Sequence, residues 1–199
     1  MKTPCFAAWL LAGCQTYDYR LYDHEPDVTT EIGIYIQADD VLVPSAIMHG
    51  CRLWSPEGAA CRRSPNPNSA DIDVYVNDGF GCFTDSGEIV AMSVSGDVIV
   101  YSQCLYSVLG EQVSHDELAI VTAHEIGHAL GIDHVPLDCE HPERSLNPGD
   151  RLPYDRQGRL ICGPALMNAE PFMDFTGPIG MTTTDHRAFA ARESAYIIY

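Results

Sequence analysis

HEIGHALGIDH, residues 124–134, is the stretch from which the fold is predicted most directly. It lies within and just beyond an apolar segment, Leu118–Leu130, whose length and composition indicate a helix. Ser114 and Glu117 are spaced as a capping box, which marks the start of that helix. Gly131 follows its last apolar residue, where a glycine commonly ends a helix. We therefore expect a buried helix that stops in the middle of the quoted stretch.

The histidines of this stretch are spaced as metal ligands. His124 and His128 are one helical turn apart, so both imidazoles leave the same face. A continued helix would point His134 in another direction, and the chain must therefore turn at Gly131, which tolerates a left-handed conformation. Three histidines with one open position are typical of a catalytic zinc ion. Glu125, beside the first histidine, is placed to move protons as the catalytic residue.

These residues resemble the metzincin pattern of zinc metallopeptidases, H-E-x-x-H-x-x-G-x-x-H, at every specified position. The resemblance implies a metzincin domain over residues 28–199, with an α/β (α+β) fold built on a twisted, mixed, mainly parallel sheet. It also implies a Met-turn below the zinc, which Met167 in Pro164–Asn168 would form, and a C-terminal helix. The Leu-Met turn and the Thr-Thr-x-Asp segment that ends at Asp185 are most similar to a bacterial matrixin-like domain.

This resemblance implies one catalytic Zn²⁺ and a polypeptide substrate that binds in extended form along an edge strand near residues 88–94.

Three features depart from the relatives. No histidine lies between His49 and His115, so the ligands of the second zinc of animal matrixins are missing. Ala169 stands where astacin-like relatives carry a tyrosine, and the segment between His134 and Met167 is long. Substrate preference is therefore not transferable.

The rest of the chain predicts one α/β domain. Alternating apolar residues indicate four strands, over residues 31–38, 71–76, 88–94 and 97–101. Residues 44–54 suit a helix, although Gly50 weakens it, and a second capping pattern starts a helix at residue 182 that extends to about residue 195. Residues 55–69 are rich in proline, arginine and asparagine and indicate a loop.

Length and charge limit the functional classes. The chain has 199 residues, enough for one domain with a sizeable core. Its 28 acidic and 11 basic residues give a formal net charge of −17, which opposes binding to nucleic acid. We expect a monomer with an acidic, solvated surface.

The first residues resemble a secretory leader. Residues 1–13 combine Lys2 with a short apolar run, and Leu11–Ala12–Gly13–Cys14 resembles the lipobox of bacterial lipoproteins. The resemblance implies that Cys14 is lipidated and anchors the protein to a membrane outside the cytoplasm, at the outer membrane or the cell surface. A general signal peptide is the alternative. Residues 14–27 are polar and suit a tether or a short prosegment.

Six further cysteines indicate disulfides in an exported chain. Sequence alone leaves fifteen pairings open; we expect sequential pairs that close local excursions, Cys51–Cys61, Cys82–Cys104 and Cys139–Cys162. Asp78, Asp85 and Glu88 could bind calcium, but a polar turn explains them more simply.

The sequence thus predicts a lipid-anchored zinc endopeptidase. Two alternatives remain: a binding lipoprotein that keeps the metzincin fold with little turnover, and a zinc amidase that acts on cell-wall material. The intact Glu125 disfavours the first, and only the family resemblance disfavours the second.

Overall fold

The computed structural model describes residues 31–37, 42–54, 60–77, 83–84, 87–88, 91–94, 96–101, 114–147, 149–169 and 182–192. Its strands are β1 (Ile32–Gln37), β2 (Cys61–Arg63), β3 (Ile72–Asn77), β4 (Phe83–Thr84), β5 (Gly87–Glu88), β6 (Ala91–Val94) and β7 (Asp97–Tyr101). Its α-helices are α1 (Leu42–Leu53), α3 (His115–Ala129) and α4 (Thr183–Arg192). Short 3₁₀ turns occupy Pro67–Ser69 and Pro142–Arg144.

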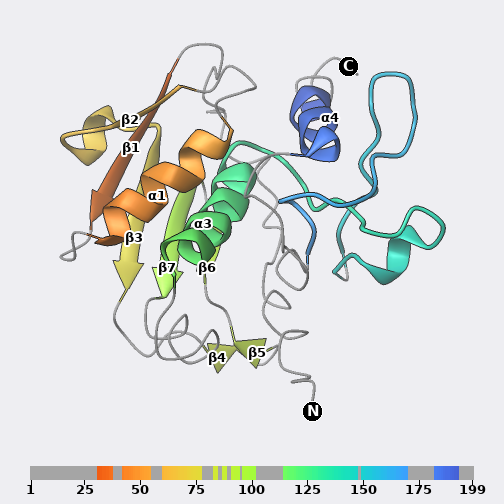
Figure 1. The fold of residues 1–199 in the computed structure, drawn as a ribbon, viewed down its shortest axis with the longest axis horizontal. Coiled ribbons are helices and arrows are strands. Elements are labelled where there is room, and N and C mark those ends of the chain that lie inside the picture. Colours follow the sequence, from red (N-terminus) through yellow and green to blue (C-terminus); the bar gives the residue numbers. More distant parts are fainter. Residues whose placement is uncertain are drawn as a thin grey trace.

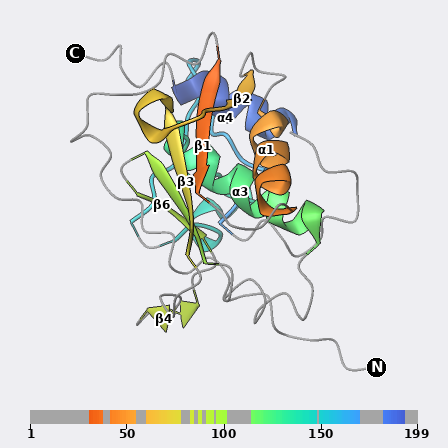
Figure 2. The ribbon, with the colours of Figure 1, turned by 90° about the vertical axis from the view of Figure 1, so that its left-hand side faces the viewer.

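Five strands form one sheet in the order β2-β1-β3-β7-β6. The first four are parallel to one another, and β6 runs antiparallel to β7 at the edge. α1 and α3 lie against the same face of this sheet (Figures 1 and 2). The mixed α/β architecture with a mainly parallel sheet, which we expected from the sequence, is confirmed.

The register explains which residues form the core. Apolar side chains at alternate positions of β1, β3 and β7 are buried, as the two-residue period of a strand requires. The pairing sets these residues side by side across the sheet, for example Ile36 beside Val74 and Val74 beside Val98. The helices cover this apolar face, and α3 packs on β6 and β7.

Two expected elements differ from the structure. Residues 55–69 are not a plain loop, because residues 61–63 add β2 beside β1 and the disulfide Cys51–Cys61 ties this short strand to α1. The strand expected over residues 88–94 is divided. Glu88 pairs with Phe83 in a separate two-stranded sheet, and Ala91–Val94 forms a hairpin with β7. Strands this short carry no periodic pattern, so only their pairing partners define them.

α1 and α3 approach each other closely at Gly50. A Cβ atom there would lie 2.5 Å from the Ala119 carbonyl oxygen and 2.9 Å from the Ala123 nitrogen, and closer still to the Thr122 hydroxyl. Real side chains essentially never approach that closely. The glycine that weakened the helix prediction is therefore required by helix packing.

Gly50→Ala is expected to destabilise the protein by about 1–3 kcal/mol, because backbone atoms of α3 must move to admit the methyl group. The helix propensity of alanine offsets at most about 1 kcal/mol. Denaturant unfolding measures the difference, with the exposed Arg52→Ala in the same helix as the control. A Gly50→Ala protein as stable as the wild type would contradict this packing.

The end of α1 also connects the helices. Trp54 is fully buried, its indole nitrogen donates to the Ala123 carbonyl oxygen at 2.9 Å, and its ring stacks on Phe189 of α4. This one side chain therefore joins the end of α1 to both later helices.

Among the described residues, no helix is long and apolar enough to cross a membrane.

Several sequence predictions fall on residues outside this description. They are the leader over residues 1–13, the tether over residues 14–27, Cys14, the pair Cys82–Cys104, Asp78 and Asp85. The backbone of Glu88 lies in β5. Calcium binding by these three residues stays a prediction.

Candidate metal centre

The helix α3 carries the first two histidines and begins as expected. The Ser114 hydroxyl accepts a hydrogen bond from the Glu117 nitrogen at 3.1 Å, and the Glu117 carboxylate accepts one from the Ser114 nitrogen at 2.8 Å. These reciprocal bonds satisfy two backbone donors that a helix start leaves unpaired. Every residue from Leu118 to Ala129 is buried.

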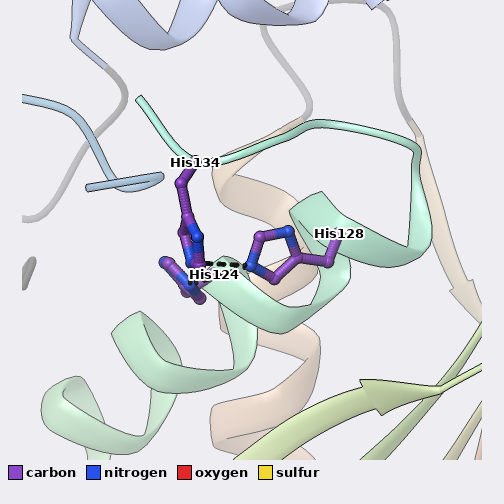
Figure 3. Close-up of side chains that lie close together, drawn as sticks. All are labelled: His124, His128 and His134. Carbon is purple, nitrogen blue, oxygen red and sulfur yellow. Dashed lines mark hydrogen bonds between the residues drawn. The ribbon is translucent and has the colours of Figure 1, made fainter. Parts of the chain in front are cut away.

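The helix ends in a Schellman motif. Gly131 has a φ of 81°, its nitrogen donates to the His128 carbonyl oxygen at 2.8 Å, and the Ile132 nitrogen donates to the Gly127 carbonyl oxygen at 2.9 Å. The left-handed glycine turns the chain back toward the helix. His134 therefore reaches the face that already carries His124 and His128 (Figure 3).

The three histidines converge through their Nε2 atoms. His128 Nε2 lies 3.1 Å from both other Nε2 atoms, and those of His124 and His134 are 3.3 Å apart. Nitrogens about 2.0–2.1 Å from a tetrahedral zinc ion lie about 3.3 Å apart. The spacing of these donors therefore fits one ion of that size.

Each imidazole is held from its other nitrogen. The Nδ1 atoms lie 2.7 Å from the Leu166 carbonyl oxygen for His124, 2.8 Å from the Ile132 carbonyl oxygen for His128, and 2.8 Å from the Asp150 carboxylate for His134. These oxygens only accept, so each Nδ1 carries the proton. Each Nε2 of a neutral ring then presents a lone pair. Three lone pairs directed at one another call for a cation between them.

Burial keeps His124 and His128 neutral. It lowers the pKa of His124 to about 3 and that of His128 well below its ordinary value, with a smaller contribution from the neighbouring His134. Only neutral imidazole binds a metal ion. The first two histidines are therefore ready to bind metal at neutral pH.

Acid is expected to lower the free energy of unfolding of the metal-free protein between about pH 6.5, the ordinary pKa of histidine, and about pH 3, the pKa of His124 in the folded protein. The unfolded chain takes up protons there that folded His124 and His128 refuse, so the free energy of unfolding falls as pH falls. Denaturant unfolding in a chelator measures this slope. His124→Gln lacks one of these groups, so its slope should correspond to about one proton fewer taken up on unfolding than in the wild type. A slope equal to that of the wild type would contradict the lowered pKa of His124.

Met167 lies under α3, the helix that carries His124 and His128. It is fully buried, and its sulfur lies against the Gly127 Cα, where a side chain would collide with it. The Met167 carbonyl oxygen accepts a hydrogen bond at 2.7 Å from Val135, which follows His134. Met167 therefore supports the helix and packs beside the segment that carries His134. Its identification as a Met-turn comes from the family resemblance and stays a prediction.

Two residues that the sequence analysis did not single out for this purpose hold this turn. Asn168 donates to the carbonyl oxygens of Val135 and Gly163 and accepts from the Ala165 nitrogen. Asp185 at the start of α4 is buried and accepts from the Leu166 nitrogen at 2.8 Å. The carbonyl of Leu166, which holds His124, is thereby fixed from α4.

Glu125 is fully buried in α3 directly after the first histidine.

The structure contains the disulfide Cys139–Cys162, the second expected pair found within the described residues. Two disulfides indicate an oxidising, extracytoplasmic compartment.

The described residues contain a second group with metal-binding side chains, formed by His49, His115 and Asp116. Helix packing thus unites the two histidines that flank the histidine-free stretch of the sequence. The rings of His49 and His115 stack 5.4 Å apart, and the Asp116 carboxylate lies 3.9 Å from His49 Nδ1 and 3.3 Å from His115 Nδ1. All three side chains are partly exposed. The 3.9 Å separation is wider than the spacing of about 3.3 Å between donors on one tetrahedral zinc ion, and exposed side chains are poorly fixed, so we expect no tight site there.

Comparison with known proteins assigns no family. No protein-family model and no curated protein matches the sequence. Two solved structures, titled "Crystal structure of myroilysin" and "Structure of myroilysin", are similar over most of their length. The first has a TM-score of 0.47 and 14% identity and covers 85% of this chain and 86% of that one. The second has a TM-score of 0.45 and 15% identity and covers 88% of this chain and 96% of that one. At these low values the similarity assigns neither an activity nor a residue role.

Proposed function

We propose that this chain is a zinc-dependent endopeptidase. One observation carries the proposal: three buried imidazoles direct their Nε2 atoms at a common point, 3.1–3.3 Å apart, and a buried glutamate directly follows the first of them in α3. Three neutral histidines are a ligand set of catalytic zinc, with a fourth position left open. A zinc ion held by His124, His128 and His134 would supply Lewis-acid chemistry, polarising a carbonyl oxygen and lowering the pKa of water.

Glu125 supplies the proton transfers in this proposal. Its carboxylate accepts a proton from the water whose oxygen attacks the peptide carbonyl carbon. When the C–N bond breaks, the same group returns that proton to the leaving amine. Burial next to His124 favours this role, because a carboxylate in a water-poor site interacts strongly with charge that develops nearby.

The edge strand β6 is the proposed binding element for the polypeptide. It is the last strand in the five-stranded order, and α3 packs against it. An extended polypeptide can add to such an edge through backbone hydrogen bonds, which tolerate many sequences. This arrangement would bring a peptide bond beside the helix that carries His124 and His128.

A cleavage assay separates this proposal from a binding protein and from a cell-wall amidase. The purified protein is tested on casein and on peptidoglycan fragments, with a chelator and after zinc is added back. We expect casein cleavage that the chelator abolishes and zinc restores. Cleavage of peptidoglycan alone would favour the amidase, and zinc binding without any cleavage would favour the binding protein.

We further propose that Cys14 is lipidated and holds the domain on a bacterial membrane outside the cytoplasm. The tetrapeptide that ends at Cys14 and the two disulfides support this location. Cell fractionation tests it, because Cys14→Ser should move the protein from the membrane fraction to the soluble one. A variant that stays with the membrane would refute lipidation.

A further inference from the structure

His134 is held differently from the other two histidines. His124 and His128 bond to backbone carbonyl oxygens, whereas His134 Nδ1 lies 2.8 Å from the Asp150 carboxylate. The side chains of His134 and Asp150 are 0% and 2% exposed. The orientation of the third ligand thus depends on one side chain that lies outside the histidine motif.

Asp150 is placed by the loop between Cys139 and Cys162. Its carboxylate also accepts from the Asn147 nitrogen at 2.8 Å, and its own nitrogen donates to the Asn147 carbonyl oxygen at 3.0 Å. The disulfide closes the loop, and the Gly163 nitrogen donates to the Pro136 carbonyl oxygen at 2.8 Å beside it. Both ends of the loop are therefore fixed near the histidine segment.

A carboxylate bonded to a metal-binding histidine fixes the tautomer and the ring orientation and makes the ligating nitrogen more basic. Its negative charge, when buried, also favours a cation nearby. We propose that Asp150 is a positioning residue for His134 and that the disulfide-closed loop, residues 139–162, retains the metal ion through it. This inference rests on metal binding by the histidines, and it does not depend on peptide hydrolysis.

Asp155 provides a matched control in the same loop. Its carboxylate accepts hydrogen bonds from the backbone nitrogens of Gln157 and Arg159 and pairs with the side chains of Arg159 and Arg187. It thus holds a turn of the loop and connects it to α4. Asp155→Asn removes a charge from the loop and leaves the Asp150–His134 contact in place.

The test is a zinc dissociation constant, measured by competition with a chelator for the full chain. Asp150→Ala should weaken zinc binding about 10–100-fold, the usual effect of losing such a partner. Asp150→Asn should fall between Asp150→Ala and the wild type, because an amide oxygen can still accept the imidazole proton but carries no charge. Asp155→Asn should bind zinc nearly as the wild type does. Unfolding curves in the chelator verify that each variant is folded.

The disulfide is tested by a double-mutant cycle. Removing Cys139 and Cys162 together, as serines, should weaken zinc binding when Asp150 is present and have little further effect in Asp150→Ala. Additive losses would overturn the role of the loop. Asp150 variants with the affinity of the wild type, or an equal loss in Asp155→Asn, would overturn the role of Asp150. A wild-type protein that binds no zinc would instead overturn the proposed function.

Discussion

Replacing Glu125 with glutamine is expected to lower kcat/KM for peptide hydrolysis by about 10²–10⁴-fold, the usual contribution of a general base. Glutamine has nearly the same size, so the buried position in α3 stays filled. It cannot accept the proton from the attacking water. The ligand set of three histidines is untouched, and the variant should therefore keep its metal ion. Cleavage of an unstructured peptide together with metal analysis of the same sample measures both effects.

Asp116→Asn is the matched control for this variant. Asp116 lies in the first turn of the same helix, and 65% of its side chain is exposed. Loss of its charge there should leave activity unchanged. A Glu125→Gln protein that cleaves peptides as fast as the wild type would remove Glu125 from the mechanism, and one that has lost its metal would show that the substitution acts through the site's structure.

His128→Ala should abolish activity by a different route, through loss of the metal ion. The Nε2 atom of His128 is 3.1 Å from the Nε2 atoms of His124 and His134. Its removal leaves two ligand atoms, which lie 3.3 Å apart. Binding free energies of protein zinc sites are on the order of 10 kcal/mol. A third of that corresponds to roughly 10²–10³-fold weaker binding. Competition with a chelator measures the change.

Thermal unfolding separates loss of metal from loss of packing in this variant. Alanine leaves a cavity at a buried position, so His128→Ala is expected to be less stable even without metal. Added zinc should raise the Tm of the wild type, because a ligand that binds only the folded state stabilises it. The Tm of His128→Ala should respond little. The exposed His141→Gln should respond like the wild type, and a full response in His128→Ala would contradict the ligand assignment.

The predictions that agree with the structure rest on local chemistry. The capping box at Ser114, the apolar run to Leu130 and the left-handed Gly131 are short-range signals, and together they define α3 and the turn after it. The convergence of the histidines follows from this one helix end. Met167 was predicted only through the family resemblance, because a buried methionine by itself is usually a core residue.

The residues that the sequence analysis missed act across irregular segments. Asp150 reaches His134 over 16 residues, and Asn168 reaches Val135 over 33. Neither lies in a periodic segment, so no pattern marks its side chain as buried. Acidic and amide residues in loops are usually exposed. Only the path of the disulfide-closed loop shows that Asp150 lies next to His134.

The metal content of the purified protein tests the central claim most directly. Elemental analysis of protein prepared without added metal should find about one zinc ion per chain, the capacity of one set of three histidines. A variant in which His124, His128 and His134 are all replaced by glutamine should contain almost no zinc, and its circular dichroism spectrum should verify that it is folded. Wild-type protein that is free of zinc and does not take it up, or a triple variant with the same zinc content, would contradict the account.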